Sequence, residues 1–238
     1  MDIKKIYEDK DVLAIDKPAG IVVFPEGQTT ENTLIDTLIE KYPGLKSVGE
    51  APRYGIVHRL DKDTSGILLV AKSNEGLIFL QKQFKNREVE KKYICLVEGS
   101  MEADSGKIET LIARAKGDPR KQKVYSAINA PKSAREAVTE YKVLKRYNDY
   151  TLLEVQIKTG RRHQIRCHFS YLKHPIAGDK LYSFKNSKRP GDTGYPEGLT
   201  RQFLHAAYLK IQLPDGQKKE LVSELPEDLK KVINNLLS

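Results

Sequence analysis

Apolar and polar positions alternate in short blocks along this chain, and most blocks predict strands. Stretches rich in Val, Ile, Leu and Tyr have strand character at residues 11–16, 21–24, 66–72, 92–98, 139–145 and 151–158. Apolar residues at helical spacing predict helices over residues 32–42, after Ser73 and over residues 226–237. Strands outnumber helices and no regular crossover helices join them. The pattern therefore predicts an α+β fold with a mixed, largely antiparallel sheet flanked by helices and loops.

Composition narrows the class of protein. The chain has 238 residues, of which 39% are hydrophobic, as in globular proteins. Its longest aliphatic run, residues 67–71, is far shorter than the roughly 18 residues of a membrane helix. Because the first residues are followed by acidic side chains rather than an apolar stretch, we expect no secretory signal and a cytoplasmic protein. Cys95 and Cys167 are too few and too far apart to predict a disulfide framework or a zinc site.

Positive charge is concentrated in one part of the sequence. The formal net charge is +9, but residues 114–189 contain 19 basic and 6 acidic residues, and the remainder has a net charge of −4. Residues 114–123 also contain Gly117 and Pro119, which predict a loop. The charge has two interpretations at this point, a solvated basic face or a surface that binds a polyanion.

A dense polar segment, HRLDKDTSG at residues 58–66, directly precedes the most apolar strand. Asp61 and Asp63 are candidates for an acid and base pair or for metal ligands, although a turn explains Asp63 better. Ser65 with His58 and Asp61 could suggest a hydrolase triad, but the segment lacks the G-x-S-x-G turn of such enzymes. Polar groups placed at the start of a buried strand indicate a catalytic loop.

A second polar segment, TGRRHQIRCHF at residues 159–169, predicts a helix that begins with Arg161 and Arg162. An apolar stripe would be bordered by a basic one formed by Arg162, Arg166 and Lys173. Positive charge at a helix N-terminus is unfavourable unless an anion lies nearby, so a phosphate or a buried carboxylate is expected there. His163 and His168 would not share a helix face, which argues against a metal site.

These motifs resemble the RluA family of pseudouridine synthases. The resemblance rests on HRLDKDTSG followed by ILLVAK, on KKY, and on TGRRHQIRCH followed by HPIAGDKLY; the segments DVLAIDKPAGIVV, AREAVTEYKVL and RQFLHAAYLKI extend it to nearly the whole chain. It implies a pseudouridine synthase-like fold with an active-site cleft across the sheet. It also implies a monomer that isomerises specific uridines in structured ribosomal or transfer RNA, without a metal, an organic cofactor or a membrane.

The resemblance assigns roles residue by residue. Asp61 matches the catalytic aspartate, Tyr93 the aromatic residue that stacks on the target base, and Arg166 the arginine paired with that aspartate. Arg59 matches an arginine linked to base flipping. The basic residues expected to contact RNA are Arg59, Lys62, Arg114, Arg120, Lys121, Arg161, Arg162 and His163. Arg162 departs from the family, which usually has threonine there.

The same resemblance predicts the domain organisation. We expect one catalytic domain over residues 1–238, without the small N-terminal S4-like RNA-binding domain of some family members. Two other functions stay open on the residues alone: a non-catalytic RNA-binding protein or chaperone on the same fold, and a glycosylase that releases a free base.

Overall fold

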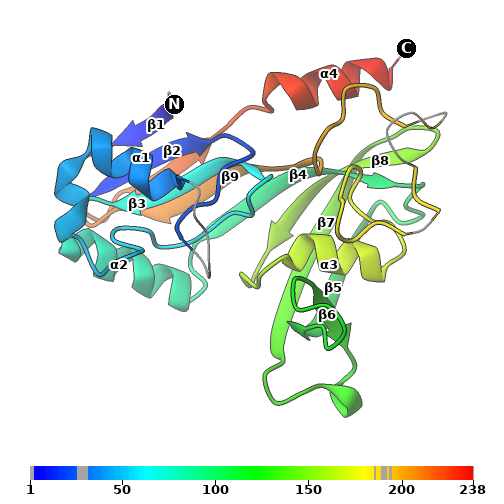
Figure 1. The fold of residues 1–238 in the computed structure, drawn as a ribbon, viewed down its shortest axis with the longest axis horizontal. Coiled ribbons are helices and arrows are strands. Elements are labelled where there is room, and N and C mark those ends of the chain that lie inside the picture. Colours follow the sequence, from blue (N-terminus) through cyan, green and yellow to red (C-terminus); the bar gives the residue numbers. More distant parts are fainter. Residues whose placement is uncertain (1–2, 26–31, 185, 189–191, 193–194, 238) are drawn as a thin grey trace. The chain divides into compact units, whose positions relative to one another are not determined.

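The computed structural model describes residues 3–25, 32–184, 186–188, 192 and 195–237. In these ranges the chain forms ten strands and four α-helices, and most of its strand pairs are antiparallel (Figure 1). The α+β class with a largely antiparallel sheet is confirmed, while the expected cleft stays a prediction. Across the same ranges, no helix combines the length and the apolar character needed to cross a membrane.

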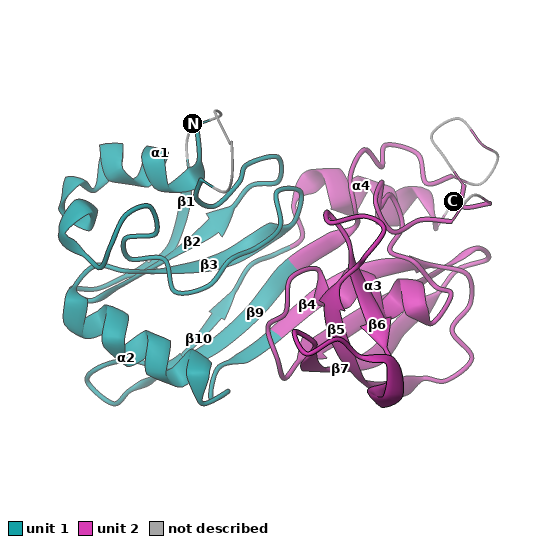
Figure 2. Ribbon diagram, turned by 60° about the horizontal axis from the view of Figure 1, so that its bottom comes forward, with its two compact units in different colours: residues 1–91, 206–224 teal, residues 92–205, 225–238 magenta. Residues whose placement is uncertain are grey.

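The chain divides into two compact units (Figure 2). Unit 1 contains Met1–Lys91 and Ala206–Glu224, and unit 2 contains Lys92–His205 and Leu225–Ser238. Strands β4 (Glu90–Glu98) and β9 (Leu204–Gln212) each have residues in both units. The single-domain organisation expected from the sequence stays a prediction.

Unit 1 is a sheet with helices on both faces. Its strand order is β1-β2-β3-β9-β10, formed by Lys4–Glu8, Val12–Lys17, Ser65–Ala71, the unit 1 part of β9, and Lys218–Val222. All seven residues of β3 are buried, which explains its uninterrupted apolar sequence. Helices α1 (Leu34–Lys41) and α2 (Asn74–Lys85) lie on opposite faces of the sheet (Figure 2).

The start of each unit 1 helix is fixed by hydrogen bonds from its first backbone amides. The Ser73 side chain accepts from the Gly76 amide and caps α2, as the sequence predicts. Before α1, the carbonyl groups of Val22 and Val23 accept from the first helical amides, those of Leu34 and Ile35. The prediction of a strand at residues 21–24 is therefore wrong, because this segment satisfies the amides of a helix N-terminus instead of joining the sheet.

The strands of unit 2 pair antiparallel in the order β4-β8-β7-β5-β6. The four strands after β4 are β5 (Ser105–Arg114), β6 (Gln122–Tyr125), β7 (Arg135–Arg146) and β8 (Tyr150–Ile157). Helix α4 (Glu227–Asn235) contributes Leu229 and Val232 to a core with Leu96 and Phe203. Helix α3 (Gln164–Tyr171) packs against β7 through the ring contact of Phe169 with Tyr141.

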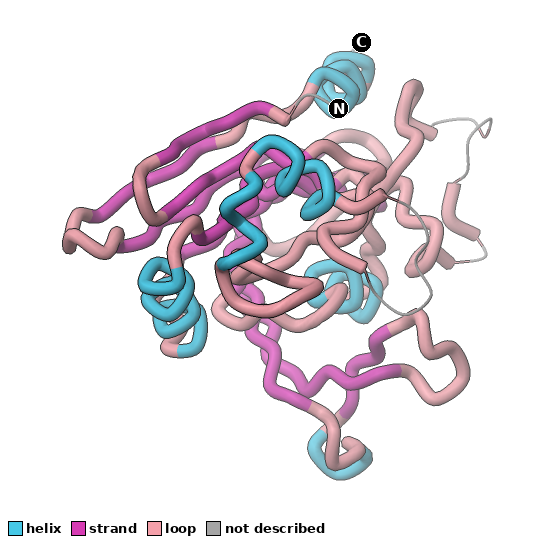
Figure 3. The backbone as a smooth tube through the Cα atoms, turned by 60° about the vertical axis from the view of Figure 1, so that its left-hand side comes forward, coloured by secondary structure: helices cyan, strands magenta, loops and turns pink. Residues whose placement is uncertain are grey.

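Strands β5 and β6 form a hairpin in the lower part of Figure 1, where β5 pairs with β7 and Val124 of β6 packs near Cys167 of α3. The basic segment expected as a loop, residues 114–123, contains the turn of this hairpin, and Arg114, Gln122 and Lys123 at its ends belong to the strands. After β6 the chain makes a short 3-10 turn, Ala127–Asn129, before it returns along β7 (Figure 3).

Helix α3 begins at Gln164 and not at Arg161, which corrects the sequence-based prediction. His163 has a positive φ of 53° and turns the chain immediately before the helix. The two arginines therefore precede the helix instead of occupying its first turn. The expected basic stripe is also absent from α3 as described, because Arg162 is exposed while Arg166 is buried.

Candidate active site

Asp61 lies on a short turn of unit 1 that leads into β3. The Thr64 amide donates to the Asp61 carbonyl at 3.1 Å, and Asp63 lies within this turn, as the turn interpretation of that residue expects. The Lys62 carbonyl accepts from the Gly20 amide at 2.9 Å and from Lys17 Nζ at 3.0 Å. The Asp61 side chain itself is part-exposed. The turn is thus fixed through its backbone while Asp61 as a whole residue stays part-exposed.

Lys17 fixes this turn from inside the protein. Its side chain is fully buried, and its ammonium group also donates to the Pro18 carbonyl at 2.8 Å. Because a buried ammonium group needs hydrogen-bond acceptors, these two carbonyl groups hold the Lys17 side chain in one orientation. The turn before β3 and the turn after β2 are therefore joined at one point.

His58 holds the other end of the same segment. The Gly55 carbonyl accepts from the Ala71 amide, and Ile56 forms a bridge with Val70, so residues 55–56 run beside β3. At the next position His58 Nε2 accepts from the Leu69 amide at 3.0 Å. The imidazole nitrogen thus accepts the hydrogen bond that a backbone carbonyl of a neighbouring strand would otherwise accept, at the point where the chain leaves the sheet. Burial and the nearby Lys91 lower the pKa of His58 to about 3, which keeps the ring neutral and able to accept.

The basic residues beside Asp61 face outward. Arg59 and Lys62 are exposed. The Arg59 guanidinium carbon lies 5.4 Å from the centre of the Phe24 ring, and that of Arg53 lies 4.9 Å from it. The Phe24 ring therefore provides an apolar support under the arginine that the family resemblance links to base flipping.

In unit 2, Tyr93 and Arg166 are both buried. Tyr93 lies on β4 opposite Val155 of β8 and is 8% exposed. Arg166 lies on α3 and forms a two-point ion pair with Asp179, with Nε 2.6 Å from Oδ2 and Nη2 2.9 Å from Oδ1. The expected burial of Arg166 is confirmed. Asp61 belongs to unit 1, so its pairing with Arg166 stays a prediction.

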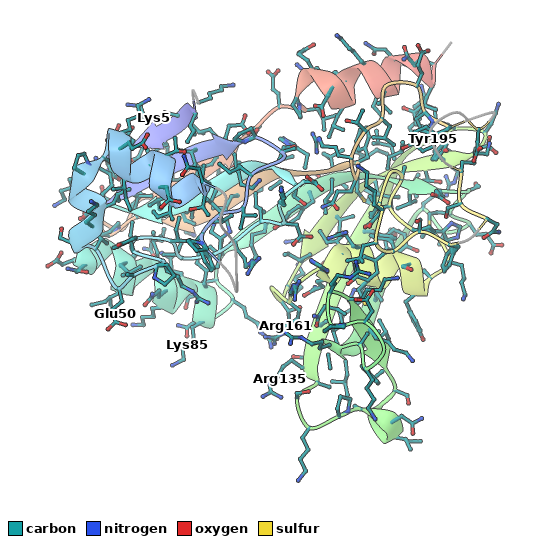
Figure 4. The ribbon with its side chains drawn as sticks, viewed as in Figure 1. Lys5, Glu50, Lys85, Arg135, Arg161 and Tyr195 are labelled. Carbon is teal, nitrogen blue, oxygen red and sulfur yellow. The ribbon has the colours of Figure 1, made fainter. Side chains whose placement is uncertain are left out.

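The segment before α3 is fixed by the side chain of Gln164. Its Oε1 accepts from Thr159 Oγ1 and from the Arg161 amide, and its Nε2 donates to the Val138 carbonyl and to Thr139 Oγ1. All four hydrogen-bonding positions of the buried amide are used. Arg161 donates through Nε to the Glu136 carbonyl at 2.8 Å. Its side chain therefore lies beside the first residues of β7, near Arg135 (Figure 4).

The histidines of this region have structural partners. His168 is fully buried between the hydroxyl groups of Thr110 and Thr139, each 2.9 Å from a ring nitrogen. Burial lowers the pKa of His168 to about 4, so the ring is neutral at pH 7. His163 Nδ1 lies 3.0 Å from the Tyr182 hydroxyl. In the part of the chain that the structure describes, no group of three or more His, Cys, Asp or Glu side chains could hold a metal ion.

The hairpin carries the other predicted RNA contacts. Arg114 and Arg120 are exposed, and Lys121 is part-exposed. Arg120 makes two hydrogen bonds with the Asp118 carboxylate, at 2.9 Å and 2.8 Å, so part of its charge is balanced within the turn. The structure therefore places these three residues together on the hairpin, and it places Arg59, Asp61 and Lys62 together in unit 1.

Several residues that shape the site were not assigned from the sequence. Asp179 and Tyr182 occur in HPIAGDKLY, and His58 occurs in HRLDKDTSG, so the motifs contain them without revealing their partners. Lys17 and Gln164 have the same status. Each of these residues is polar and lies within an apolar stretch or a motif. That position indicates that the residue has a role, but it does not show which hydrogen bond the residue makes.

Comparison with known proteins agrees with these motifs. A family model described as RNA pseudouridylate synthase matches residues 11–171. An uncharacterized RNA pseudouridine synthase of Aquifex aeolicus is 46% identical over 190 residues, which cover 79% of this chain and 58% of that protein. Ribosomal large subunit pseudouridine synthase D of Xanthomonas campestris is 39% identical over 236 residues, covering 97% of this chain and 68% of that protein.

A solved structure shows the same similarity. Human RNA pseudouridylate synthase domain containing 4 superposes with a TM-score of 0.76 and 27% identity, covering 98% of this chain and 93% of that chain. The family model covers more than half of the sequence, and the motif that contains Asp61 falls inside the matched range. The chain therefore belongs to the RNA pseudouridylate synthase family, a group of isomerases that modify RNA.

Proposed function

We propose that this protein converts specific uridines of a structured RNA into pseudouridine, with Asp61 as the catalytic carboxylate. The reaction breaks the bond between N1 of uracil and C1′ of ribose and forms a bond from C5 to C1′. The proton lost from C5 is balanced by one gained at N1. Reactant and product have the same composition, so the reaction needs no oxidant, reductant or group donor.

The observation that carries the proposal is the fixed presentation of Asp61. Its turn is held through the Lys62 carbonyl by Gly20 and Lys17, and His58 fixes the chain just before it. Enzymes place reacting groups on rigid elements because a displaced group loses most of its effect. The carboxylate stays part-exposed and can meet a ribose or a base.

Tyr93 and Arg166 are proposed to complete the site. A base in folded RNA must leave its stack, which costs a few kcal/mol, and stacking on an aromatic ring returns about 1–3 kcal/mol. Tyr93 would supply that ring. An arginine beside an aspartate lowers the carboxyl pKa by about 1–3 units, so pairing with Arg166 would keep Asp61 ionised.

The RNA substrate is proposed to be ribosomal RNA, with transfer RNA as the other possibility. Relatives such as the Xanthomonas protein are named for the large ribosomal subunit. The hairpin residues Arg114 and Lys121 and the exposed Arg162 would contact phosphates. The protein would then act in the cytoplasm, where ribosomal and transfer RNA are found.

The test uses RNA that carries tritium at C5 of uridine, because pseudouridine formation releases that label to water. Large-subunit ribosomal RNA and total transfer RNA are treated separately, and the products are analysed as nucleosides. We expect label release and pseudouridine from one of them. Free uracil with an abasic site would instead identify a glycosylase, and unchanged RNA that is nonetheless bound would identify a non-catalytic binding protein.

Asp61→Asn is the decisive variant, with Asp63→Asn as its matched control. The first change removes the carboxylate but keeps the shape of the side chain, so we expect turnover to fall by about a thousandfold with RNA affinity nearly unchanged. The control makes the same change two positions away and should keep most of the activity. Residual turnover of Asp61→Asn within tenfold of the wild type would reject the catalytic role.

A further inference from the structure

The Tyr182 hydroxyl connects the β5–β6 hairpin with the segment just before α3, two parts of unit 2 to which the proposed function gives separate roles. The Gln122 amide, at the first residue of β6, donates to the Tyr182 Oη at 2.7 Å. The same oxygen lies 3.0 Å from His163 Nδ1, just before α3. An amide can only donate, so Oη accepts from Gln122 and its own proton is available to a neutral His163 ring.

The remainder of Tyr182 is joined to Arg166. The guanidinium carbon of Arg166 lies 5.0 Å from the centre of the tyrosine ring, within the range of a cation–π contact. The Tyr182 amide donates at 3.0 Å to Asp179 Oδ1, the oxygen that also accepts from Arg166 Nη2. One residue therefore contacts the turn end of the hairpin with its hydroxyl and the buried ion pair with its ring and backbone.

The surrounding core is small. Tyr182 clusters with Ile112 of β5, Ala137 of β7 and Cys167 of α3, and Val124 of β6 packs against this cluster while only partly buried. Few large apolar side chains anchor this end of the hairpin. A directional hydrogen bond therefore contributes more to the orientation of this hairpin than it would at a well-packed strand.

We propose that Tyr182 is a positioning residue that fixes the orientation of the β5–β6 hairpin with respect to Arg166. It would keep the hairpin residues that contact phosphates at a fixed distance and angle from Arg166. RNA bound to the hairpin would then place its target uridine in the same position at every encounter. The proposal rests on the proposed function, because it assigns RNA contacts to the hairpin. A tyrosine that only fills the core would need its ring but not its hydroxyl.

The first experiment needs no RNA. Tyr182→Phe keeps the ring and removes only the hydroxyl, and amide hydrogen exchange is measured in the free protein. We expect exchange at Gln122 and in the hairpin turn to become about fivefold faster, the effect of one hydrogen bond of ordinary strength. Exchange in β8 should not change. Equal exchange rates at Gln122 in the wild type and in the variant would overturn the proposal.

The matched control is Tyr195→Phe. Tyr195 is another tyrosine of unit 2, part-buried where Tyr182 is buried, and its hydroxyl donates to the Leu199 carbonyl at 3.0 Å. It lies at the opposite end of unit 2 from the hairpin (Figure 4). Its loss should leave the exchange of the hairpin and the kinetics toward RNA unchanged, which separates the specific link from the general loss of a tyrosine hydroxyl.

The second experiment compares kinetic constants on the RNA identified above. We expect Tyr182→Phe to raise KM about fivefold with kcat within twofold of the wild type. Tyr182→Leu, which also removes the ring beside Arg166, should lower kcat in addition. An effect of Tyr182→Phe on kcat alone, with unchanged KM, would contradict the link to the hairpin.

A double variant shows whether the effect passes through the hairpin. Changing both Arg114 and Lys121 to alanine should raise KM, and adding Tyr182→Phe should then raise it by much less than fivefold. Full multiplication of the two effects would reject the link. If the wild type forms no pseudouridine at all, the proposed function fails, while the exchange experiment still decides whether the Tyr182 hydroxyl fixes the hairpin.

Discussion

The basic part of the sequence separates into two regions of unit 2 that hold their charges in opposite ways. Around α3, Arg166 is buried and paired with Asp179 at two points, and the nearby His168 is buried and neutral. On the hairpin, Arg120 has 76% of its side chain exposed and pairs with Asp118 in its own turn. The net charge of the sequence does not distinguish these residues. The buried arginine of the first region is suited to fixing another side chain, and the exposed residues of the second region are suited to binding a flexible polyanion.

The largest expected effect is at the buried ion pair. Asp179→Asn removes the carboxylate that holds both Arg166 donors, and breaking a buried pair typically costs about 3–5 kcal/mol of unfolding free energy. Urea unfolding at pH 7 measures this loss. Asp118→Asn is the equivalent change on the hairpin and should leave the urea midpoint where it is. Similar losses in both variants would remove the distinction between the two regions.

The pH dependence of stability gives a second test of the buried region. The pKa of His168 is about 4 in the folded protein and near 6.5 when unfolded, so the unfolded state binds more protons between these values. Stability is therefore complete above about pH 6.5 and falls toward pH 4, by up to about 1.4 kcal/mol per pH unit for one proton.

Urea unfolding at pH 7, 6 and 5 measures this slope, with His168→Gln as the comparison. His58 has the same sign of shift in unit 1, so the variant should retain part of the slope and not all of it. A slope identical to that of the wild type would show that His168 gains its proton without loss of stability.

Tyr93 tests whether a buried aromatic residue of unit 2 acts on RNA directly. If the ring stacks on the target base, Tyr93→Ala loses about 1–3 kcal/mol of stacking, which corresponds to a reduction of kcat/KM by about five- to 150-fold. Tyr93→Phe keeps the ring and should remain close to the wild type. Equal losses in both variants would assign the role to the hydroxyl.

The smallest expected effect is on the salt dependence of RNA binding. Each phosphate contact contributes about −0.7 to −0.9 to the slope of log affinity against log salt concentration. Lys121→Ala should reduce the magnitude of the slope by about one unit. Arg120→Ala should reduce it less, because Asp118 already balances part of that charge. If neither variant changes the slope, the hairpin is a solvated surface and the RNA contacts lie elsewhere.

Sequence patterns predicted elements well where local interactions decide them. The helix after Ser73 has its cap and its apolar face within a few residues, and the structure confirms both. Residues 21–24 look equally strand-like, but the carbonyl groups of Val22 and Val23 accept from the first amides of α1, which lie twelve residues further along the chain. The spacing of apolar residues does not show whether a carbonyl group will bond to a neighbouring strand or to the N-terminus of a helix.

The same limit applies to the site. The motifs located the segments around Asp61 and Arg166, but they did not reveal that Arg166 pairs with Asp179 or that Gln164 begins the helix. The start of α3 depends on four hydrogen bonds from one buried amide to residues of two other segments. Such bonds follow from the tertiary structure and leave no repeating pattern in the chain.

The division of unit 1 into two sequence segments has a consequence for synthesis on the ribosome. Strand β3 is completed early, but its neighbour in unit 1, the part of β9 from Ala206 onward, is translated more than 130 residues later. Until then one edge of the most apolar strand is bordered at its end by residues 55–58 but still lacks β9, and uncovered edges favour pairing with other chains. Residues 92–205 of unit 2 emerge during that interval. A nascent chain that is stalled before Ala206 should therefore depend on a chaperone far more than the finished protein does.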